Sequence, residues 1–360
     1  MKKFRKYITG IPSFRNCLVV LLFVTTTVGA KKNCDFLDVY GTDKIDSDSI
    51  CEALYDDLNK VMRLFENKAF LVNLQVTEEE LSYWSSIPAR IKTMGPFESV
   101  VFSPVSYIDG RVFITIDVVE TKDAEKRSNF YPNPQESISD VAGLIEQWDK
   151  YAKLGYKLFY TDPKAIQFTS CPGFHCLYGF EYPAFKKYGD LFVREVPLKT
   201  DALIKVLQRD KDVRKRGTAV YLLAYTKDIK VLLKALRLAI RDPNALVRNN
   251  VMRVLESAIS ENRTTDFPLG EIMAALDFPS ETDRNKALYI VLSLVERSDF
   301  SDYFAKKEGS QFVKLLKMRQ PNIHDVAYQI LKKISRKDYG EHDYVSWNKW
   351  AEQVSSTQQV

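Results

Sequence analysis

The sequence predicts a mainly α-helical protein in which a small α+β unit precedes a stack of helix pairs. Three observations support this prediction. A short motif recurs every 34 to 40 residues in the C-terminal half, apolar residues at helical spacing follow each recurrence, and strand-like segments meet at Asp109-Gly110 nearer the N-terminus. With 360 residues and 45% hydrophobic content, the chain can build two or three domains with a core and is not a disordered sequence.

The recurring motif centres on positions 214, 248, 284 and 324, which are 34, 36 and 40 residues apart. Such periods are typical of solenoids built from helix pairs. One pair cannot cover its own apolar face, so neighbouring pairs are expected to stack. The apolar positions that follow the motif place one stripe on a second helix in every unit: Val220 and Leu223, Val254 and Ala258, Ile290 and Leu294, Ile330 and Ile334.

The segment 229–240 has the pattern of the first helix of a pair. Its apolar residues follow the i, i+3, i+4, i+7 rule, and its lysines and arginines fall on the other side. Asp242-Pro243 then supplies an N-cap acceptor and a proline, which suit the start of the next helix.

The sequence Asp-Pro-x-x-x-Val-Arg at 242–248, with the apolar spacing after it, resembles the turn of HEAT repeats. The resemblance covers about residues 200–337 and implies a HEAT-like α-α superhelix, a solenoid, over 199–338. In HEAT repeats this arginine commonly joins a ladder with the aspartates of neighbouring turns. The resemblance therefore implies a structural role for Arg214, Arg248 and Arg284, whereas the fourth repeat departs from the pattern with His324.

Residues 1–30 have the three parts of a secretory signal peptide. Five basic residues precede or flank an apolar run at 17–28, and Val28-Gly29-Ala30 offers a small-residue cleavage site. The apolar run is short for a membrane span, so no transmembrane segment is expected after cleavage, with an uncleaved anchor as the alternative. We therefore expect a periplasmic or secreted protein. The mature chain has 47 basic and 47 acidic residues, a balance that does not indicate nucleic-acid binding.

Four cysteines follow the leader, and an even number in an exported chain favours disulfides. The predicted disulfides are Cys171–Cys176, which closes a tight loop that contains Pro-Gly, and Cys34–Cys51. The alternative reading makes Cys171, His175 and Cys176 metal ligands. Three ligands with two of them adjacent are a poor chelating arrangement without a fourth.

Residues 31–120 predict the small α+β domain. An extended start at 36–40 leads to a helix at 50–65 with a cap at 47–49, and a short strand or buried loop at 70–76 leads to a second helix from 77 toward 94. Two strands, 97–108 and 111–120, then form a hairpin. This order, with Gly95-x-Phe97-x-x-Val100 and the closing 116–120, resembles a POTRA domain. The resemblance implies protein contacts within a bacterial envelope through the sheet edge. The alternative is an ordinary α+β unit that packs on the next domain.

The remaining segments organise around the repeats. Residues 121–135 predict a linker, and 136–198 predict a helical cap with the disulfide loop, containing helices at 137–158 and 181–193. Residues 339–360 predict a C-terminal capping helix and tail, in which Tyr344, Trp347 and Trp350 share one helical face.

The sequence contains no nucleotide-binding loop, nucleophile elbow, H-E-x-x-H or paired-cysteine zinc signature. His324 and His342 lie in helical contexts without a nearby cysteine or a matched second histidine. We therefore expect no enzyme activity, and we assign no catalytic, cofactor-binding or metal-ligating residue and no cofactor.

Charge distribution supplies the candidate partner site. Residues 205–253 contain thirteen Lys/Arg against four Asp/Glu, whereas residues 31–127 contain twelve against eighteen. The interpretation is that an acidic protein or an anionic envelope surface binds the basic face of the first repeats. The alternatives are a solvated helix face and a contact with the chain's own acidic domain. The candidate residues are Lys230, Lys234, Arg237 and Arg241.

Together these patterns predict an exported, non-enzymatic protein-binding scaffold, a component or accessory of a bacterial envelope complex. Two alternatives stay open. Some HEAT-like solenoids resemble DNA-alkylation glycosylases, which would make the chain a nucleic-acid enzyme, and an exported scaffold could also be a secreted effector that binds host proteins.

Overall fold

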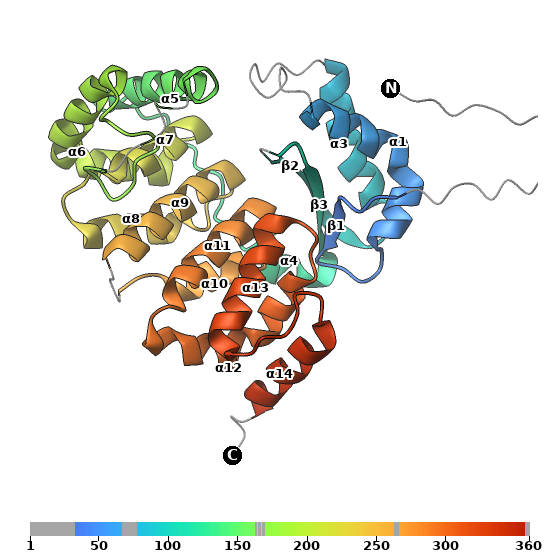
Figure 1. Ribbon diagram of the computed structural model, residues 1–360. Coiled ribbons are helices and arrows are strands. Elements are labelled where there is room, and N and C mark those ends of the chain that lie inside the picture. Colours follow the sequence, from blue (N-terminus) through green and yellow to red (C-terminus); the bar gives the residue numbers. More distant parts are fainter. Residues whose placement is uncertain are drawn as a thin grey trace, which may run out of the picture. The chain divides into compact units, whose positions relative to one another are not determined.

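Helices make up most of the protein, and a three-stranded sheet lies in the N-terminal part of the described chain (Figure 1). This confirms the mainly helical class with a small sheet. The sequence from Asn33 onward forms one compact unit. The predicted signal peptide, the segment 70–76 and the end of the tail lie outside the described residues. The computed structural model describes residues 33–66, 78–107, 109–162, 164, 167, 170–262 and 266–356.

The sheet has the strand order β1-β3-β2. Strand β1 (Leu37–Tyr40) pairs in parallel with β3 (Val112–Glu120), and β2 (Phe97–Ser106) pairs with β3 in the antiparallel sense. The hairpin predicted at Asp109-Gly110 is confirmed. Gly110 has a positive φ of 88°, a conformation that glycine adopts without strain, and the Asp109 carboxylate accepts the Arg111 backbone N–H.

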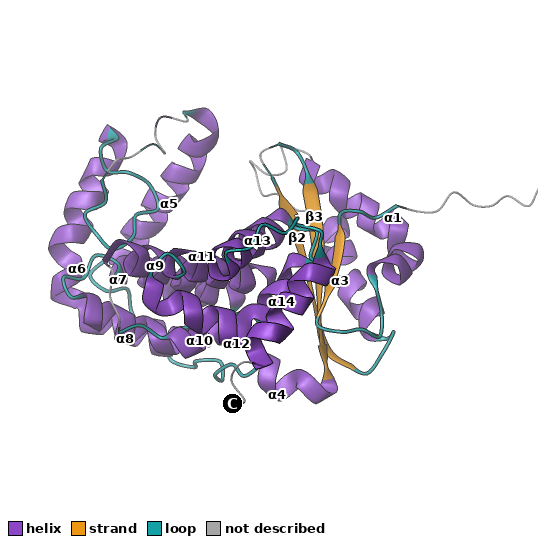
Figure 2. Ribbon diagram, turned by 60° about the horizontal axis from the view of Figure 1, so that its bottom comes forward, coloured by secondary structure: helices purple, strands orange, loops and turns teal. Residues whose placement is uncertain are grey.

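Helices α1 (Ser47–Glu66) and α3 (Glu78–Lys92) lie on the same side of the sheet (Figure 2). Their apolar faces and the sheet bury a core that includes Leu58, Ile87 and Ile116. The N-cap of α1 differs from the prediction. The acceptor is Asp46, whose carboxylate takes the Ser49 backbone N–H at 2.8 Å, so the cap lies just before the predicted residues 47–49.

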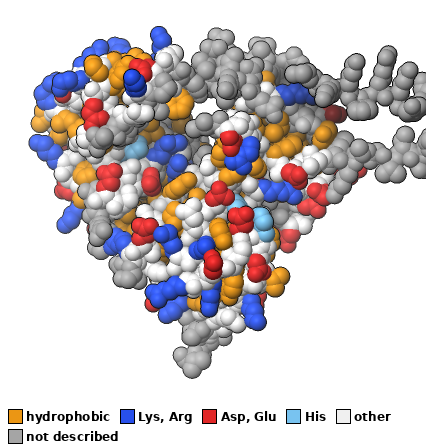
Figure 3. All heavy atoms as spheres, viewed as in Figure 1, with side chains coloured by type: hydrophobic (Ala, Val, Ile, Leu, Met, Phe, Trp, Pro, Cys, Tyr) orange, Lys and Arg blue, Asp and Glu red, His pale blue; other side chains and the backbone are white. Residues whose placement is uncertain are grey.

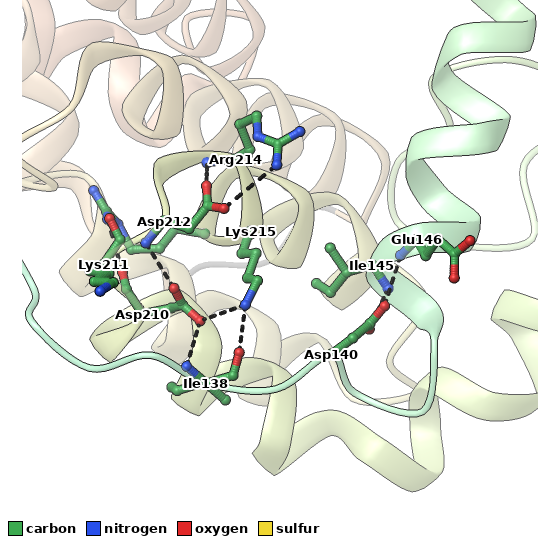
Figure 4. A network of polar contacts seen from close by, with 10 residues as sticks. Ile138, Asp140, Ile145, Glu146, Asp210, Lys211, Asp212, Arg214 and Lys215 are labelled. Carbon is green, nitrogen blue, oxygen red and sulfur yellow. Dashed lines mark hydrogen bonds and ion pairs between the residues drawn. The ribbon is translucent and has the colours of Figure 1, made fainter.

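The predicted linker is packed against the helices. It begins with η1 (Thr121–Asp123) and α4 (Ala124–Arg127), and the Arg127 side chain is buried. The Phe130 ring lies 5.0 Å from the Phe278 ring, and the Tyr131 N–H donates to the Arg241 carbonyl. Beyond it, the Lys215 ammonium donates to the Ile138 carbonyl, and the chain runs beside α7 (Figure 4). The segment is therefore part of the compact unit.

Two helices of the predicted cap have different bounds from those expected. Helix α5 (Leu144–Thr161) begins seven residues after 137 because the Asp140 carboxylate accepts the backbone N–H groups of Ile145 and Glu146 and thereby fixes the start. Helix α6 (Pro183–Arg209) continues well past 193, with Pro197 inside it. The predicted second helix and the first helix of the repeats are therefore one helix.

Eight further helices follow in the described part of the chain. Four of them, α7, α9, α11 and α13, pack on one another in chain order, as Figure 1 shows from left to right. Their predicted apolar positions Val220, Val254, Ile290 and Ile330 are all fully buried. The bounds are α7 (Val213–Leu223), α8 (Ile229–Ala239), α9 (Ala245–Asn262), α10 (Leu269–Ala275), α11 (Glu281–Leu294), α12 (Ser298–Leu316), α13 (Pro321–Ser335) and α14 (Tyr344–Ser356).

Helix α14 packs on α12. Trp347 and Trp350 are buried, and the Trp347 indole N–H donates to the Gly340 carbonyl at 2.9 Å. The third aromatic residue of the predicted face, Tyr344, is only partly buried.

Three arginines at equivalent helix positions are buried and paired with carboxylates, and we call them, with His324, the ladder residues; the first of them is Arg216, whereas the predicted Arg214 is exposed. Each ladder residue is the fourth residue of its helix, and its side chain donates to the backbone carbonyl six residues earlier. Arg214 is the second residue of α7, where its exposed side chain reaches Asp212 (Figure 4). The hydrogen bonds from the ladder side chains to the backbone carbonyls are Arg216 to Asp210 (2.9 Å), Arg248 to Asp242 (2.9 Å), Arg284 to Phe278 (3.0 Å) and His324 Nδ1 to Met318 (3.1 Å).

The ladder carboxylates come from two sources. The Asp242 carboxylate, from the next helix pair, accepts hydrogen bonds from both Nε and Nη2 of Arg216. The Asp283 carboxylate accepts one from Arg248 Nε at 2.8 Å. The third arginine, Arg284, is instead paired with Asp117 of strand β3, at 2.7 and 2.8 Å to its two carboxylate oxygens. The sheet therefore contributes a member of the ladder.

Both expected disulfides are present, Cys34–Cys51 and Cys171–Cys176, in place of the metal-ligand alternative for the second pair. The first ties the loop before β1 to helix α1. Within the described residues, no helix has the length and apolar character to cross a bilayer.

The Arg284–Asp117 pair predicts the response to one substitution. Asp117→Asn leaves the buried guanidinium without its carboxylate and should lower the free energy of unfolding by about 3–5 kcal/mol. The control variant is Arg214→Ala, at an exposed arginine two residues before the ladder residue Arg216. It should change the free energy of unfolding by less than about 0.5 kcal/mol. Urea titrations followed by circular dichroism give both values, and equal losses would contradict the assignment of the ladder.

The two disulfides should differ in their contribution to stability. Cys34 and Cys51 are 17 residues apart in the sequence, and Cys171 and Cys176 are 5 apart. Because loop-closure entropy grows with loop length, the double alanine variant of the first pair should be about 1 kcal/mol less stable than that of the second. Thermal unfolding of both variants measures the difference, and the reverse order would contradict the entropic account.

Candidate functional site

A groove of about 260 Å³ lies between helices α5, α7 and α9, and we call it the α5–α9 groove. Its floor is aromatic, because the Trp148 and Tyr221 rings stack at 5.1 Å. Leu246 is half exposed at its rim. Charged and amide groups complete the lining: Asp149, Lys153, Arg214 and Asn250.

The local sequence explains how these side chains reach the groove. Residues 214, 217, 218 and 221 lie on one face of α7, and 246 and 250 are one turn apart on α9. The Tyr221 hydroxyl donates to the Asn250 side chain at 3.0 Å and joins the two helices. Arg214, which the sequence assigned to the ladder, is therefore a groove residue.

Next to the groove lies a second group of side chains, which we call the cationic cluster: His175, Arg253 and Lys286. His175 stacks on the groove residue Tyr221, with ring centroids 5.7 Å apart. Arg253 lies on α9 close to Asn250, and Lys286 lies on the neighbouring helix α11. Figure 3 shows one face of the molecule, on which basic, acidic and hydrophobic side chains are interspersed.

The cationic cluster is short of negative charge. Arg253 and Lys286 are half-buried, and in the described part of the chain neither has a carboxylate within 4.0 Å. Burial, and next the Arg253 guanidinium, lower the pKa of Lys286. Burial raises the pKa of the nearest acid, Glu256, against the opposing effect of both cations. An added anion would relieve this repulsion.

His175 is uncharged at neutral pH. Burial, with smaller contributions from Arg253 and Lys286, lowers the pKa of its imidazole to about 4. Its Nδ1 lies 2.8 Å from the Ser257 Oγ, and its Nε2 is buried without a hydrogen-bond partner among the described residues. In a serine-histidine catalytic pair the second ring nitrogen faces an orienting carboxylate, and no described residue supplies one here. The arrangement is suited to binding an anion or a hydrogen-bond donor.

The four predicted partner-binding residues lie elsewhere. Lys230, Lys234 and Arg237 project from the exposed side of α8, and Arg241 follows that helix half-buried. Arg237 is paired with Glu271 of α10 at 2.8 Å. Lys230, Lys234 and Arg237 therefore share one exposed face of α8, whereas Arg241 lies beyond its end, and the role of the four residues in binding stays a prediction.

Another polar groove lies between the end of β1 and helix α12. Its volume is about 490 Å³, and its lining includes Asp38, Glu120 and Lys314. Its charges are largely satisfied within the chain, since Glu120 pairs with Lys44 and Lys122, and Asp38 accepts backbone N–H groups. The α5–α9 groove with its cationic cluster is therefore the stronger candidate.

Sequence reasoning missed both the groove and one cluster of histidines. The residues of the groove come from three helices that are not consecutive in the chain, and no local motif marks them. The interpretation that His324 and His342 lack a matched second histidine is wrong, because their rings lie 5.4 Å apart. His342 also lies in a turn before α14 and not in a helix.

The described residues form a mainly helical protein with a candidate groove beside a cationic cluster. Comparison of the chain with protein-family models, with curated proteins and with solved structures gives no match.

The buried His175 predicts how stability depends on pH. Its pKa is about 4 in the folded protein against 6.5 for an ordinary histidine, so only the unfolded chain takes up a proton between these values. The free energy of unfolding should be at its full value above about pH 6.5 and should fall by about 3 kcal/mol on acidification to pH 4. His175→Gln should flatten this part of the profile, and His342→Gln, at an exposed histidine, should not. Denaturant titrations at several pH values test this, and a wild-type slope retained by His175→Gln would contradict it.

Proposed function

We propose that this protein is a non-enzymatic scaffold that binds an acidic segment of a partner protein in the α5–α9 groove and on the cationic cluster. The observation that carries the proposal is the pair Arg253 and Lys286, two neighbouring half-buried cations that form no ion pair within 4.0 Å with a described carboxylate. Desolvated like charges are costly, and a bound carboxylate would be attracted to both.

The apolar part of the groove supports a peptide over a free ion. Half-exposed Leu246, beside the largely buried rings of Trp148 and Tyr221, offers contact to an apolar side chain next to the charged ones. Aromatic and arginine residues are enriched at the energetically important positions of protein interfaces. An extended segment with alternating acidic and apolar residues fits this combination.

The proposal includes a HEAT-like solenoid for residues 199–338. Its support is that helices α7, α9, α11 and α13 begin at an equivalent place in their units. The fourth residues of these helices are Arg216, Arg248, Arg284 and His324, respectively. Stacked helix pairs commonly use an extended surface across several units for binding. The POTRA-like resemblance of residues 31–120 stays a prediction.

The proposal also includes export, with the protein acting in the periplasm or in a complex of a bacterial envelope. Two disulfides support an oxidising compartment. The leader-like sequence at 1–30 points the same way.

Charge reversal tests the binding surface. A fluorescein-labelled decapeptide with alternating glutamate and leucine serves as the probe, and fluorescence anisotropy measures its binding to the full chain. The double variant R253E/K286E should weaken binding at least tenfold, because both attractive charges become repulsive. The matched double variant K230E/K234E makes the same charge change on α8 and should stay within threefold of the wild type.

Three other outcomes would overturn the proposal. One is equal weakening by both double variants, which would indicate a diffuse charge effect. Another is selective loss in K230E/K234E, which would favour the α8 face. The third is tighter binding of a single-stranded DNA oligonucleotide of equal charge, which would favour the nucleic-acid alternative.

Raising the salt concentration should weaken peptide binding, because the groove is open to solvent.

A further inference from the structure

Three potential metal-ligating side chains meet at the C-terminal end of the described array. The His324 Nε2 lies 3.7 Å from one carboxylate oxygen of Glu341, and the His342 Nε2 lies 3.6 Å from the other. One ligand atom from each of the three residues falls within a 4.8 Å cluster. They come from helix α13 and from the turn before α14.

The position of His324 in the repeat explains how its ring is oriented. It occupies the ladder place that arginine holds in the three preceding units, and its Nδ1 lies 2.7 Å from the Leu316 carbonyl and 3.1 Å from the Met318 carbonyl. Carbonyl oxygens only accept hydrogen bonds, so Nδ1 carries the proton. In the neutral ring the Nε2 lone pair then faces Glu341. A backbone carbonyl that fixes the tautomer in this way is a common second partner of histidines that bind metals.

The other two ligands are accessible from solution. The side chains of His342 and Glu341 are 71% and 52% exposed, whereas His324 is only 10% exposed. The His342 Nδ1 lies 3.3 Å from the Tyr344 hydroxyl. When this nitrogen donates its proton to the hydroxyl oxygen, the His342 Nε2 is also free to act as a ligand.

We propose that His324, Glu341 and His342 form a binding site for a divalent transition-metal ion, with Zn²⁺ as the best fit. Two imidazoles and one carboxylate are a ligand set that zinc takes with a fourth position left to water. Tetrahedral bonds to zinc place neighbouring ligand atoms roughly 3.3 Å apart, so the observed separations need only a small contraction. The exposed side chains of the turn can supply this movement.

The bound ion would fasten the C-terminal capping helix to the array. Its ligands join α13 to the turn that leads into α14, and Gly340, beside that turn, accepts the Trp347 indole N–H. A metal that binds the folded state in preference to the unfolded state stabilises it. Metal binding should therefore raise the melting temperature, with no requirement for the α5–α9 groove.

The test uses the full chain without a histidine tag, stripped of metal with a chelator. Titration with Co²⁺ should give a saturable visible absorption band at one equivalent, and Zn²⁺ should displace it. Glu341→Gln and His342→Gln should each weaken Zn²⁺ binding at least tenfold and abolish the rise in melting temperature. Asp338→Asn changes an exposed carboxylate in the same connecting segment, paired with Lys332, and should bind as the wild type does.

The two main variants change exposed side chains, so they should fold, and circular dichroism without metal checks this. Binding below one equivalent at saturation, or equal Zn²⁺ affinity in the wild type and in His342→Gln, would overturn the site. Loss of binding in Asp338→Asn to the same extent as in Glu341→Gln would also overturn it, because it would indicate diffuse attraction to surface carboxylates.

Discussion

The buried ion pair between Arg284 and Asp117 joins the two parts of this fold. Neither side chain is accessible to solvent, and the residues are 167 positions apart in the sequence. Burial raises the pKa of Asp117, and the Arg284 guanidinium opposes that shift. Removing two charges from water costs several kcal/mol per ion, so the pair contributes little net stability. Its consequence is specificity, since any other placement of the sheet leaves a buried arginine without a counter-charge.

The third and fourth units lack an aspartate at the place that Asp210 and Asp242 hold in the first two units, and the sheet compensates for this. Asp210 and Asp242 stand six residues before the first two ladder arginines, and each accepts the backbone N–H two residues on. Phe278 and Met318 occupy these places in the third and fourth units. The sheet supplies the missing groups, since Asp117 takes Arg284 and the Asp38 carboxylate takes the backbone N–H groups of Arg319 and Gln320. Tyr40 lies between them, with its ring 4.0 Å from the Arg284 guanidinium.

Periodic features were predictable from the sequence, and features that depend on tertiary contacts were not. The apolar stripes and the Asp109-Gly110 hairpin follow from local rules and are present. The ladder was misplaced by two residues in the first unit because the Val-Arg pair at 213–214 matches the motif, whereas the helix start at Val213 puts Arg216 in the equivalent position. The predicted linker is packed because Arg127 and Phe130 contact residues some 150 positions away, which no local pattern indicates.

The ladder also explains why the cationic cluster is unusual for this protein. Among the described residues, the four buried arginines each have a carboxylate within 4.0 Å, including Arg127, whose Nη2 lies 3.7 Å from Asp117. Arg253 and Lys286 lie on the same stacked helices and have none. The sheet places the Asp117 carboxylate beside Arg284. No carboxylate is placed in the same way beside Arg253 and Lys286 in the described residues. Half-buried cations without a close counter-charge are costly, and under the proposed function a bound anionic partner would offset that cost.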